Sequence, residues 1–226
     1  MAVLEVIAFD LEGCKIAEDN GADRIELCAD PHLGGTTPSF ELIDQCVNSI
    51  QIPINVMIRP RGGDFVYTSQ EFQVMKNSIE RIRDIGVNGF VFGILKKDNT
   101  LDLERNKSLK NLSGSSEVTF HRAFDQIAHP FTSTYNLIGL GFKRILTSGQ
   151  MNFAIEATEF LADLIDLADN QISIMPGSGI TSVNISKLNR VLNAKEYHTS
   201  AKILDSNGNY LGVDPQEVMK IKSLIG

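Results

Sequence analysis

The sequence predicts an α/β protein of the (β/α)8 TIM barrel type, and three observations support that prediction. Eight short runs rich in β-branched and aromatic residues recur along the 226 residues. Segments with the apolar spacing of amphipathic helices lie between them. Each strand and its helix take about 28 residues, which fits a compact barrel. The alternative is an open doubly wound sheet, which rarely alternates through eight complete units.

The predicted strands follow one another at regular intervals. They cover 3–9, 24–28, 54–59, 89–94, 118–121, 144–148, 172–175 and 197–200. No linker, low-complexity segment or shift of composition separates them. The prediction is therefore a single domain over residues 1–226, because a chain of this length can bury one large core.

The helix after the third predicted strand has the clearest signals. Its apolar residues share one face and are Phe72, Met75, Ile79 and Ile82. Thr68 and Glu71 have the spacing of a capping box at its start, and Gly86 marks its end. A second apolar stripe runs over 157–168, and Asp214 followed by Pro215 predicts a closing helix.

Composition excludes several functional classes. The net charge of -7, from 21 basic and 28 acidic residues, argues against nucleic-acid or anionic-membrane binding, since both need a basic surface. Glu5 lies where a signal peptide would be apolar, and the longest apolar run, 89–95, is far too short for a membrane span. Cys14, Cys28 and Cys46 form no disulfide framework. We expect a cytoplasmic protein that binds neither nucleic acid nor membrane.

Alternation along the strands places an unusual set of charged side chains inside the barrel. These inward residues are Glu5, Arg24, Glu26, Arg59, His121, Glu196 and His198. Buried charges cost several kcal/mol each unless they are paired or bound to a ligand. One explanation is a structural ion-pair network of Glu5 and Glu26 with Arg24. The other is a functional site at the C-terminal strand ends, where barrel active sites lie.

Two loops at that end are candidates for anion binding. Gly177, Ser178 and Gly179 follow the seventh strand and lead to Thr181, a predicted helix N-cap. Backbone amides of such a turn bind phosphate well, and barrels often bind phosphate at this position. The alternative is a tight turn that needs glycine for its positive φ.

Arg59 and Arg61 leave the third strand beside two glycines. Their guanidinium groups can hold a carboxylate or a phosphate through paired hydrogen bonds. The alternative is that these arginines neutralise Glu5 or Glu26.

Several residues are candidates for proton transfer. His121 would transfer a proton with Asp125 orienting it, and His198 and Glu26 are further candidates. Arg122 has the outward parity and is expected to support a loop or an interface. No lysine lies at an inward strand end, which disfavours a Schiff-base enzyme.

Soft donors for a metal also occur on the inward positions. They are Cys28, Met57, Met175, His121 and His198. Thiolate and thioether ligands favour Cu(I), although buried cysteine and methionine more often fill the core. Cys14 and Cys46 lie on the first two predicted helices, where we expect inert packing.

Several stretches resemble the CutC copper homeostasis family. They include GADRIELC at 21–28, VMIRPRGGDF at 56–65, TFHRAFD at 119–125 and EYHTSA at 196–201, and they run in order from residue 4 to about 201. The resemblance implies a cytoplasmic (β/α)8 barrel, copper tolerance and Cu(I) binding, with cysteines of the first two strands as ligands. Cys28 matches the second of these cysteines, and Ile7 stands at the position of the first. A homodimer is expected from the family.

The sequence thus leads to two hypotheses. The first is a CutC-like cytoplasmic protein of copper homeostasis that binds or traffics Cu(I) through Cys28. The second is a barrel enzyme that acts on a small anionic or phosphorylated metabolite at the C-terminal face.

Overall fold

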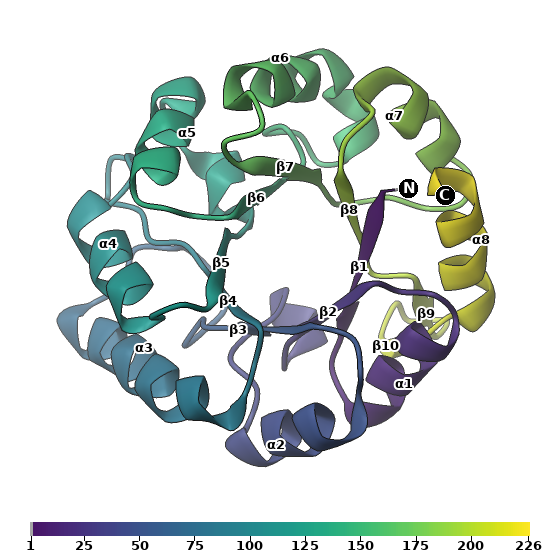
Figure 1. Cartoon of the computed structure of the whole chain (residues 1–226), viewed down its shortest axis with the longest axis horizontal. Coiled ribbons are helices and arrows are strands. Elements are labelled where there is room, and N and C mark those ends of the chain that lie inside the picture. Colours follow the sequence, from purple (N-terminus) through teal and green to yellow (C-terminus); the bar gives the residue numbers. More distant parts are fainter. Residues whose placement is uncertain (1) are drawn as a thin grey trace.

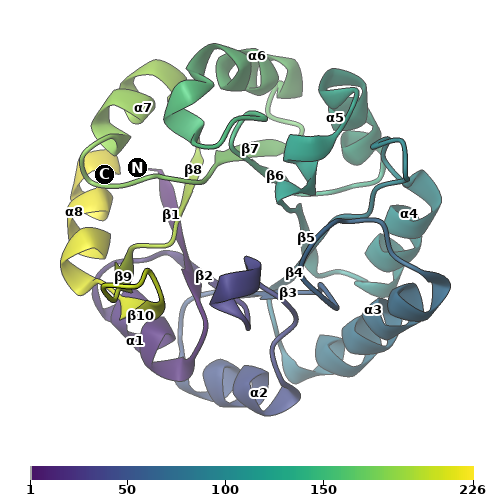
Figure 2. The same cartoon turned by 180° about the vertical axis from the view of Figure 1, so that it is seen from behind.

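Eight parallel strands form a barrel that a ring of helices surrounds (Figure 1, Figure 2). The computed structural model describes residues 2–226. The barrel strands are β1 (Val3–Ala8), β2 (Arg24–Leu27), β3 (Ile54–Met57), β4 (Gly89–Phe92), β5 (Glu117–Phe120), β6 (Arg144–Thr147), β7 (Ser173–Pro176) and β8 (Glu196–Thr199). The predicted (β/α)8 barrel is confirmed, and each predicted strand overlaps one of these.

The first and the last barrel strand of the chain, β1 and β8, pair with each other. The order is β7, β6, β5, β4, β3, β2, β1, β8, so β1 lies between β2 and β8. Glu5 is in register with Arg24 on one side and with His198 on the other. Within residues 2–226, no paired register joins β7 to β8, although the two strands pack side by side. We call this junction the β7–β8 seam.

The helices pack against the outer face of the barrel. They are α1 (Leu11–Asp19), α2 (Phe40–Ser49), α3 (Ser69–Ile82), α4 (Leu103–Leu112), α5 (Pro130–Gly139), α6 (Thr158–Ala168), α7 (Ile185–Leu192) and α8 (Pro215–Ile225). Short 3-10 helices lie in the loops: η1 (Pro31–Leu33), η2 (Arg83–Ile85), η3 (Arg122–Gln126) and η4 (Ala154–Glu156). Across residues 2–226, none of these helices is long and apolar enough to cross a membrane.

The predicted helix ends are mostly confirmed. Thr68 and Glu71 form the capping box of α3, in which each side chain accepts a hydrogen bond from the other residue's backbone amide. The Asp214 carboxylate caps α8. The prediction for Thr181 is wrong, because α7 begins at Ile185 after Asn184. The intervening turn is fixed by the Thr181 amide, which donates to Asn184 Oδ1.

A hairpin that the sequence analysis missed lies between β8 and α8. Its strands are β9 (Lys202–Leu204) and β10 (Tyr210–Val213), beside α1 and α8 (Figure 2). The turn uses Gly208 at φ +84° and the Asp205 carboxylate, which accepts from the Asn207 and Asn209 amides. An Asn-Gly dipeptide between short apolar runs was the available signal.

Inward and outward strand faces differ in chemistry, as predicted. Apolar side chains such as Leu4, Val6 and Ile25 are fully buried in the main core cluster with residues from the surrounding helices. All seven predicted inward residues are also buried, with Glu196 and His198 the most exposed at 8 %. The interior therefore holds a polar site within an apolar shell.

Candidate functional site

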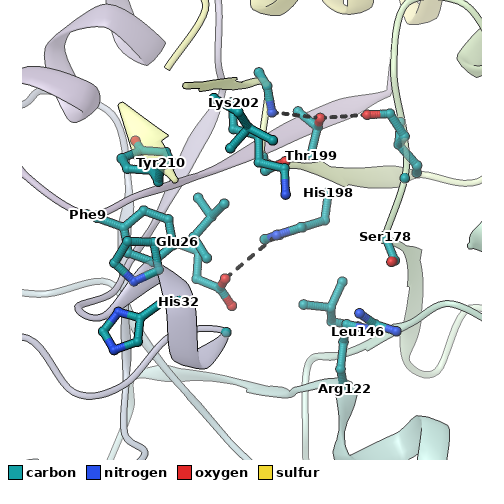
Figure 3. Close-up of a pocket in the computed structure, with 18 of the residues that line it drawn as sticks. Phe9, Glu26, His32, Arg122, Leu146, Ser178, His198, Thr199, Lys202 and Tyr210 are labelled. Atoms are coloured by element: carbon teal, nitrogen blue, oxygen red, sulfur yellow. Dashed lines mark hydrogen bonds and ion pairs between the residues drawn. The ribbon is translucent and has the colours of Figure 1, made fainter. Parts of the chain in front are cut away.

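A cavity of about 900 Å³ opens at the C-terminal ends of the strands. Glu26 and His198 line its interior, and His121 lines it from the end of β5. In Figure 3, the Glu26 and His198 side chains point toward each other, with Phe9 and Tyr210 on one side and Ser178 on the other. The cavity has the position and size of a small-molecule site.

Beneath the cavity, four buried charges form an ion-pair network. Arg24 Nε donates to Glu5 at 2.5 Å, and its Nη2 contacts Glu196. Arg144 Nε also donates to Glu196, at 2.9 Å. Although burial opposes ionisation, Arg24 and His198 hold the pKa of Glu5 far below its usual range. The structural explanation of the sequence analysis therefore applies to Glu5 and Arg24, and Arg144 is a member that it did not include.

Glu26 belongs to a different part of this interior. Its Oε2 lies 3.7 Å from His198 Nε2, and its Oε1 has no hydrogen-bond partner within residues 2–226. Burial, with a contribution from the charge on Glu5, raises the pKa of Glu26 to about 7, while His198 opposes the shift. A carboxyl group with a pKa near neutrality can both accept and return a proton.

His198 connects Glu26 to the network below. Its Nδ1 lies 2.9 Å from Glu5 Oε1. Burial lowers the pKa of His198, but Glu26 and Glu5 outweigh burial and raise it above the usual value. The ionised carboxylate of Glu5 therefore positions the imidazole on one side. On the other side the imidazole faces Glu26, whose pKa is near neutrality.

His121 has the opposite electrostatic environment. Burial and the nearby Arg59 guanidinium lower its pKa to about 3, so the ring is neutral at physiological pH. Its Nδ1 accepts a hydrogen bond from the Ala123 amide at 3.2 Å. Its ring also packs against Phe65, with 4.8 Å between centroids. The predicted contact with Asp125 is not made in the structure.

Asp125 instead organises the loop after β6. Its carboxylate accepts hydrogen bonds from the Thr147 hydroxyl, the Ser148 amide and hydroxyl, and Arg122 Nε. Arg122 lines the cavity and also donates to Ser148 at 3.0 Å. Asp125 therefore supports the cavity wall and holds Arg122 at its edge.

The two predicted arginines have most of their donors engaged elsewhere, although Arg59 Nε is buried without a partner within residues 2–226. Arg59 Nη1 and Nη2 donate to the carbonyls of Leu33, Gly35 and Gly63. Arg61 pairs with Glu71 and Asp64. Arg59 lines the cavity, but Arg61 is not among the lining residues. The geometry thus gives these side chains a role in holding the loops around η1 and α3.

The glycine-rich turn after β7 does line the cavity. Ser178 and Gly179 have φ of +78° and +68°, and together with Ile180 they face the cavity. Within residues 2–226, the amides of these three residues donate to no protein acceptor. A Cβ on Gly179 would lie 2.4 Å from Phe153 Cδ1, so only glycine fits there. Gly177 is held by Thr147, whose carbonyl accepts its amide hydrogen.

The predicted soft metal donors come together only in part, because Met57, His121 and His198 line the cavity whereas Cys28 and Met175 do not. Cys28 is fully buried, packs with Met57 and Val91, and is not among the lining residues. Met175 Sδ accepts from Arg24 Nη2 at 3.4 Å. Burial, together with the charges of Glu26 and Glu5, raises the pKa of the Cys28 thiol well above its usual value. The thiol is therefore protonated, whereas a metal ligand must be a thiolate.

A group with metal-ligand chemistry does occur at Glu5, Glu26 and His198, whose donor atoms lie within 4.8 Å of one another. This set is hard and oxygen-rich, which suits Cu(I) poorly. The Arg24 guanidinium touches Glu5, so the cluster already contains a cation. These residues fit proton transfer better than they fit a copper ion.

Several residues of the cavity were not predicted because they belong to the hairpin or to η1. Lys202 and Tyr210 line the wall opposite the turn after β7, and His32 lines it from η1. Lys202 forms no ion pair within residues 2–226. Lys202 therefore reaches the cavity from β9, a strand that was not predicted, and not from a barrel strand end.

Comparisons with known proteins agree with the fold. The model of the CutC family matches residues 2–203. A CutC family protein of Parabacteroides distasonis is 45 % identical over 201 residues, covering 88 % of this chain and 83 % of the relative. The human copper homeostasis protein cutC homolog is 42 % identical over 206 residues, covering 91 % and 76 %.

Two solved structures extend the comparison. A copper homeostasis protein CutC from Streptococcus agalactiae superposes with a TM-score of 0.84 at 34 % identity, covering 88 % of this chain and 99 % of that one. Phosphoribosylanthranilate isomerase from Thermotoga maritima gives a TM-score of 0.66 at 12 % identity, covering 100 % and 98 %. The second likeness concerns the barrel fold alone.

Proposed function

The chain belongs to the CutC family, and we propose that this member uses its barrel mouth as an enzyme site for acid–base chemistry on a small anionic metabolite. The observation that carries the proposal is the Glu26 carboxyl group, which is 1 % exposed and leaves Oε1 unpartnered at the cavity. An unpaired buried polar atom costs free energy that a bound ligand can recover. Its pKa of about 7 suits transfer of a proton at neutral pH.

The anionic part of the substrate is assigned to the turn after β7. The free amides of Ser178, Gly179 and Ile180 face the cavity there and would donate to phosphate or carboxylate oxygens. Lys202 supplies an unpaired positive charge at the same mouth. Gly177 supports the turn through its bond to Thr147.

Each remaining site residue has a role that follows from its contacts. Glu26 takes the substrate proton and returns it. Glu5 holds His198 through Nδ1, and Nε2 of the same ring positions Glu26. Asp125 acts as a positioning residue for Arg122. Arg59 acts through its charge on His121 and through the loop carbonyls that it binds.

A calorimetric titration with inorganic phosphate tests the anion site directly. Gly179→Ala should weaken phosphate binding at least tenfold, because the new Cβ collides with Phe153 and shifts the turn. Gly114→Ala is the matched control, since Gly114 also has a positive φ but does not line the cavity. Equal affinity in the two variants, or no phosphate binding by the unmodified protein, would contradict the proposal.

Cu(I) handling is the second candidate, and the names of the human and mouse relatives favour it. The ion would be cargo, bound by the Cys28 thiolate with Met57 in the same buried cluster. Binding would have to displace the thiol proton, so its affinity should rise with pH.

An anaerobic Cu(I) competition titration of the reduced protein tests this candidate. Tight stoichiometric binding that Cys28→Ser abolishes would establish copper handling through this thiol. Cys14→Ser is the matched control, because Cys14 is an equally buried thiol on α1. Binding that is weak, or that Cys28→Ser leaves unchanged, would remove copper as a function of this site.

We further propose that the protein acts in the cytoplasm as a homodimer. Val183 and Val191, just before and on α7, are exposed apolar side chains that a second copy of the chain would cover. Light scattering coupled to size-exclusion chromatography should give twice the chain mass, and a monomer would refute the dimer.

A further inference from the structure

His121 presents a single hydrogen-bond donor to the cavity. Its Nδ1 accepts from the Ala123 amide, so the proton of the neutral imidazole lies on Nε2. Nε2 is buried and has no partner within residues 2–226, and the residue lines the cavity. The ring is fixed by Phe65, and a Cβ on Gly93 would lie 2.8 Å from Nδ1. The structure therefore holds one rigid, unpaired N–H on a residue of the cavity wall.

A neutral imidazole with a fixed N–H suits one kind of ligand group. It cannot transfer a proton as an imidazolium would, because its pKa is about 3. It can donate a hydrogen bond to an oxygen that gains negative charge during a reaction. A carbonyl oxygen that becomes an enolate oxygen meets that description.

Glu26 supplies the complementary group in the same cavity. Its free Oε1 is an acceptor that no protein donor satisfies within residues 2–226. Four side chains that line the cavity carry a buried polar atom without a partner within residues 2–226, and these atoms are Glu26 Oε1, His121 Nε2, Arg59 Nε and the Tyr210 hydroxyl. The free amides of the turn after β7 belong to the same lining. A ligand that uses Glu26, His121 and these amides must combine a removable proton, a carbonyl oxygen and an anion.

We propose that the substrate is an α-hydroxycarbonyl compound with a phosphate or carboxylate group, and that the protein catalyses proton transfer between its two adjacent oxygen-bearing carbons. This inference rests on the proposed function, because it assigns the proton acceptor and the anion site described above. His121 is the electrophilic residue and Glu26 the base.

The reaction balances without a further reactant. The Glu26 carboxylate takes the proton from the hydroxyl-bearing carbon, and the C–H electron pair forms a carbon–carbon double bond. The carbonyl π electrons move to oxygen, where the His121 N–H stabilises the charge. The hydroxyl proton moves to that oxygen as the second carbonyl forms, and protonated Glu26 returns its proton to the former carbonyl carbon. The product is the isomeric α-hydroxycarbonyl compound.

Other chemistry at this site fits the residues less well. A Schiff-base mechanism needs a lysine whose pKa is lowered by burial, and Lys202 is exposed in a hairpin strand. A covalent acyl or phosphoryl enzyme needs an activated nucleophile, and Cys28 is buried outside the cavity. Proton transfer uses the groups that the cavity does present.

Deuterium exchange provides the test. The protein is incubated in D2O with glyceraldehyde 3-phosphate or ribose 5-phosphate, and exchange at the carbon beside the carbonyl is followed by proton NMR. We expect exchange with at least one of these probes and a loss of at least 100-fold in Glu26→Gln. The variant is purified identically, so it also reports any contaminating isomerase.

Two substitutions at His121 separate a chemical role from a structural one. His121→Phe keeps an aromatic ring against Phe65 but removes the N–H, and exchange should fall at least tenfold while phosphate affinity stays within twofold. His121→Gln restores an N–H and should recover part of the exchange rate. Equal exchange in the Phe variant and the unmodified protein would overturn the assignment of His121.

The outcomes also distinguish the two proposals. A probe that binds in the calorimeter but shows no exchange would overturn the proton-transfer reaction and leave the anion site intact. Failure of inorganic phosphate and of every probe to bind would overturn both.

Discussion

Two histidines at one barrel mouth have pKa values shifted in opposite directions because their neighbours differ. His198 lies between the carboxylates of Glu5 and Glu26, which raise its pKa despite burial. His121 is equally enclosed, but burial and a nearby guanidinium, that of Arg59, lower its pKa to about 3. The same residue type therefore provides a more basic positioning group in one place and a neutral donor in the other.

The low pKa of His121 makes a prediction about stability. The unfolded chain takes up a proton at this residue below pH 6.5, whereas the folded protein does not until about pH 3. Stability is therefore present above pH 6.5 and is lost as the pH falls toward 3. In urea unfolding at pH 7 and pH 4, His121→Phe should remove about 3 kcal/mol of this pH-dependent loss of stability. An unchanged difference between the two pH values would show that His121 is charged when folded.

Glu26 makes the opposite prediction. Its folded pKa of about 7 lies above the usual 4.5, so its contribution to stability is full below pH 4.5 and is lost as the pH rises through 7. Relative to Glu26→Gln, the unmodified protein should lose roughly 3 kcal/mol between pH 4.5 and pH 8. Thermal unfolding of both proteins across this range measures the difference. A parallel pH dependence would place the Glu26 pKa near its unfolded value.

At the scale of secondary-structure elements, the helix caps that depend only on neighbouring residues were predicted correctly from the sequence. The capping box of Thr68 and Glu71 and the Asp214 cap formed where the sequence placed them, because each needs only neighbouring residues. The N-cap of α7 shifted from Thr181 to Asn184, because contacts with Glu217 on α8 hold the turn at Ser182. That contact spans 35 residues and leaves no local signal.

The β9–β10 hairpin makes an element-scale prediction. It packs on the barrel mainly through Tyr210, whose ring lies 4.9 Å from that of Phe9, and through buried Val213. Replacing residues 203–209 by a short glycine–serine linker should cost less than about 2 kcal/mol, because this segment is mostly exposed. Phosphate affinity should nevertheless fall several-fold, since the segment positions Lys202. Unaltered affinity in calorimetry would exclude the hairpin from the site.

At the scale of the whole molecule, strand alternation predicted which charges lie inside but not which of them pair. All seven inward residues are buried, yet Glu26 faces His198 and not Arg24. Pairing depends on the register between strands and on side-chain rotamers, and alternation alone determines neither. The resemblance in sequence predicted the family. The candidate roles follow from the burial, charges and contacts of the residues in the structure.

The buried ion-pair network makes a prediction for global stability. Arg24→Met would leave Glu5 and Glu196 without their shared partner, and breaking such a buried pair costs about 3–5 kcal/mol. The surface control is Arg83→Met, whose exposed pair with Asp84 should contribute less than about 1 kcal/mol. Urea unfolding measures both. Similar losses in the two variants would indicate that the interior charges are solvated.

The double variant tests the cause of that loss. Adding Glu5→Gln to Arg24→Met removes one of the two carboxylate charges that Arg24→Met leaves without its partner. Part of the lost stability should therefore return. A further loss in the double variant would show that Glu5 is stabilised by groups other than Arg24.

The β7–β8 seam has a consequence for how the barrel can deform. A ring whose ladder is complete must break backbone hydrogen bonds to widen, whereas this one can open along a line that carries none within residues 2–226. The turn after β7 and the start of the hairpin after β8 stand on opposite sides of that line, tied by the Thr199 hydroxyl to the Ile180 carbonyl. One side-chain hydrogen bond therefore replaces a backbone ladder across this junction, beside the turn that is proposed to bind the anion.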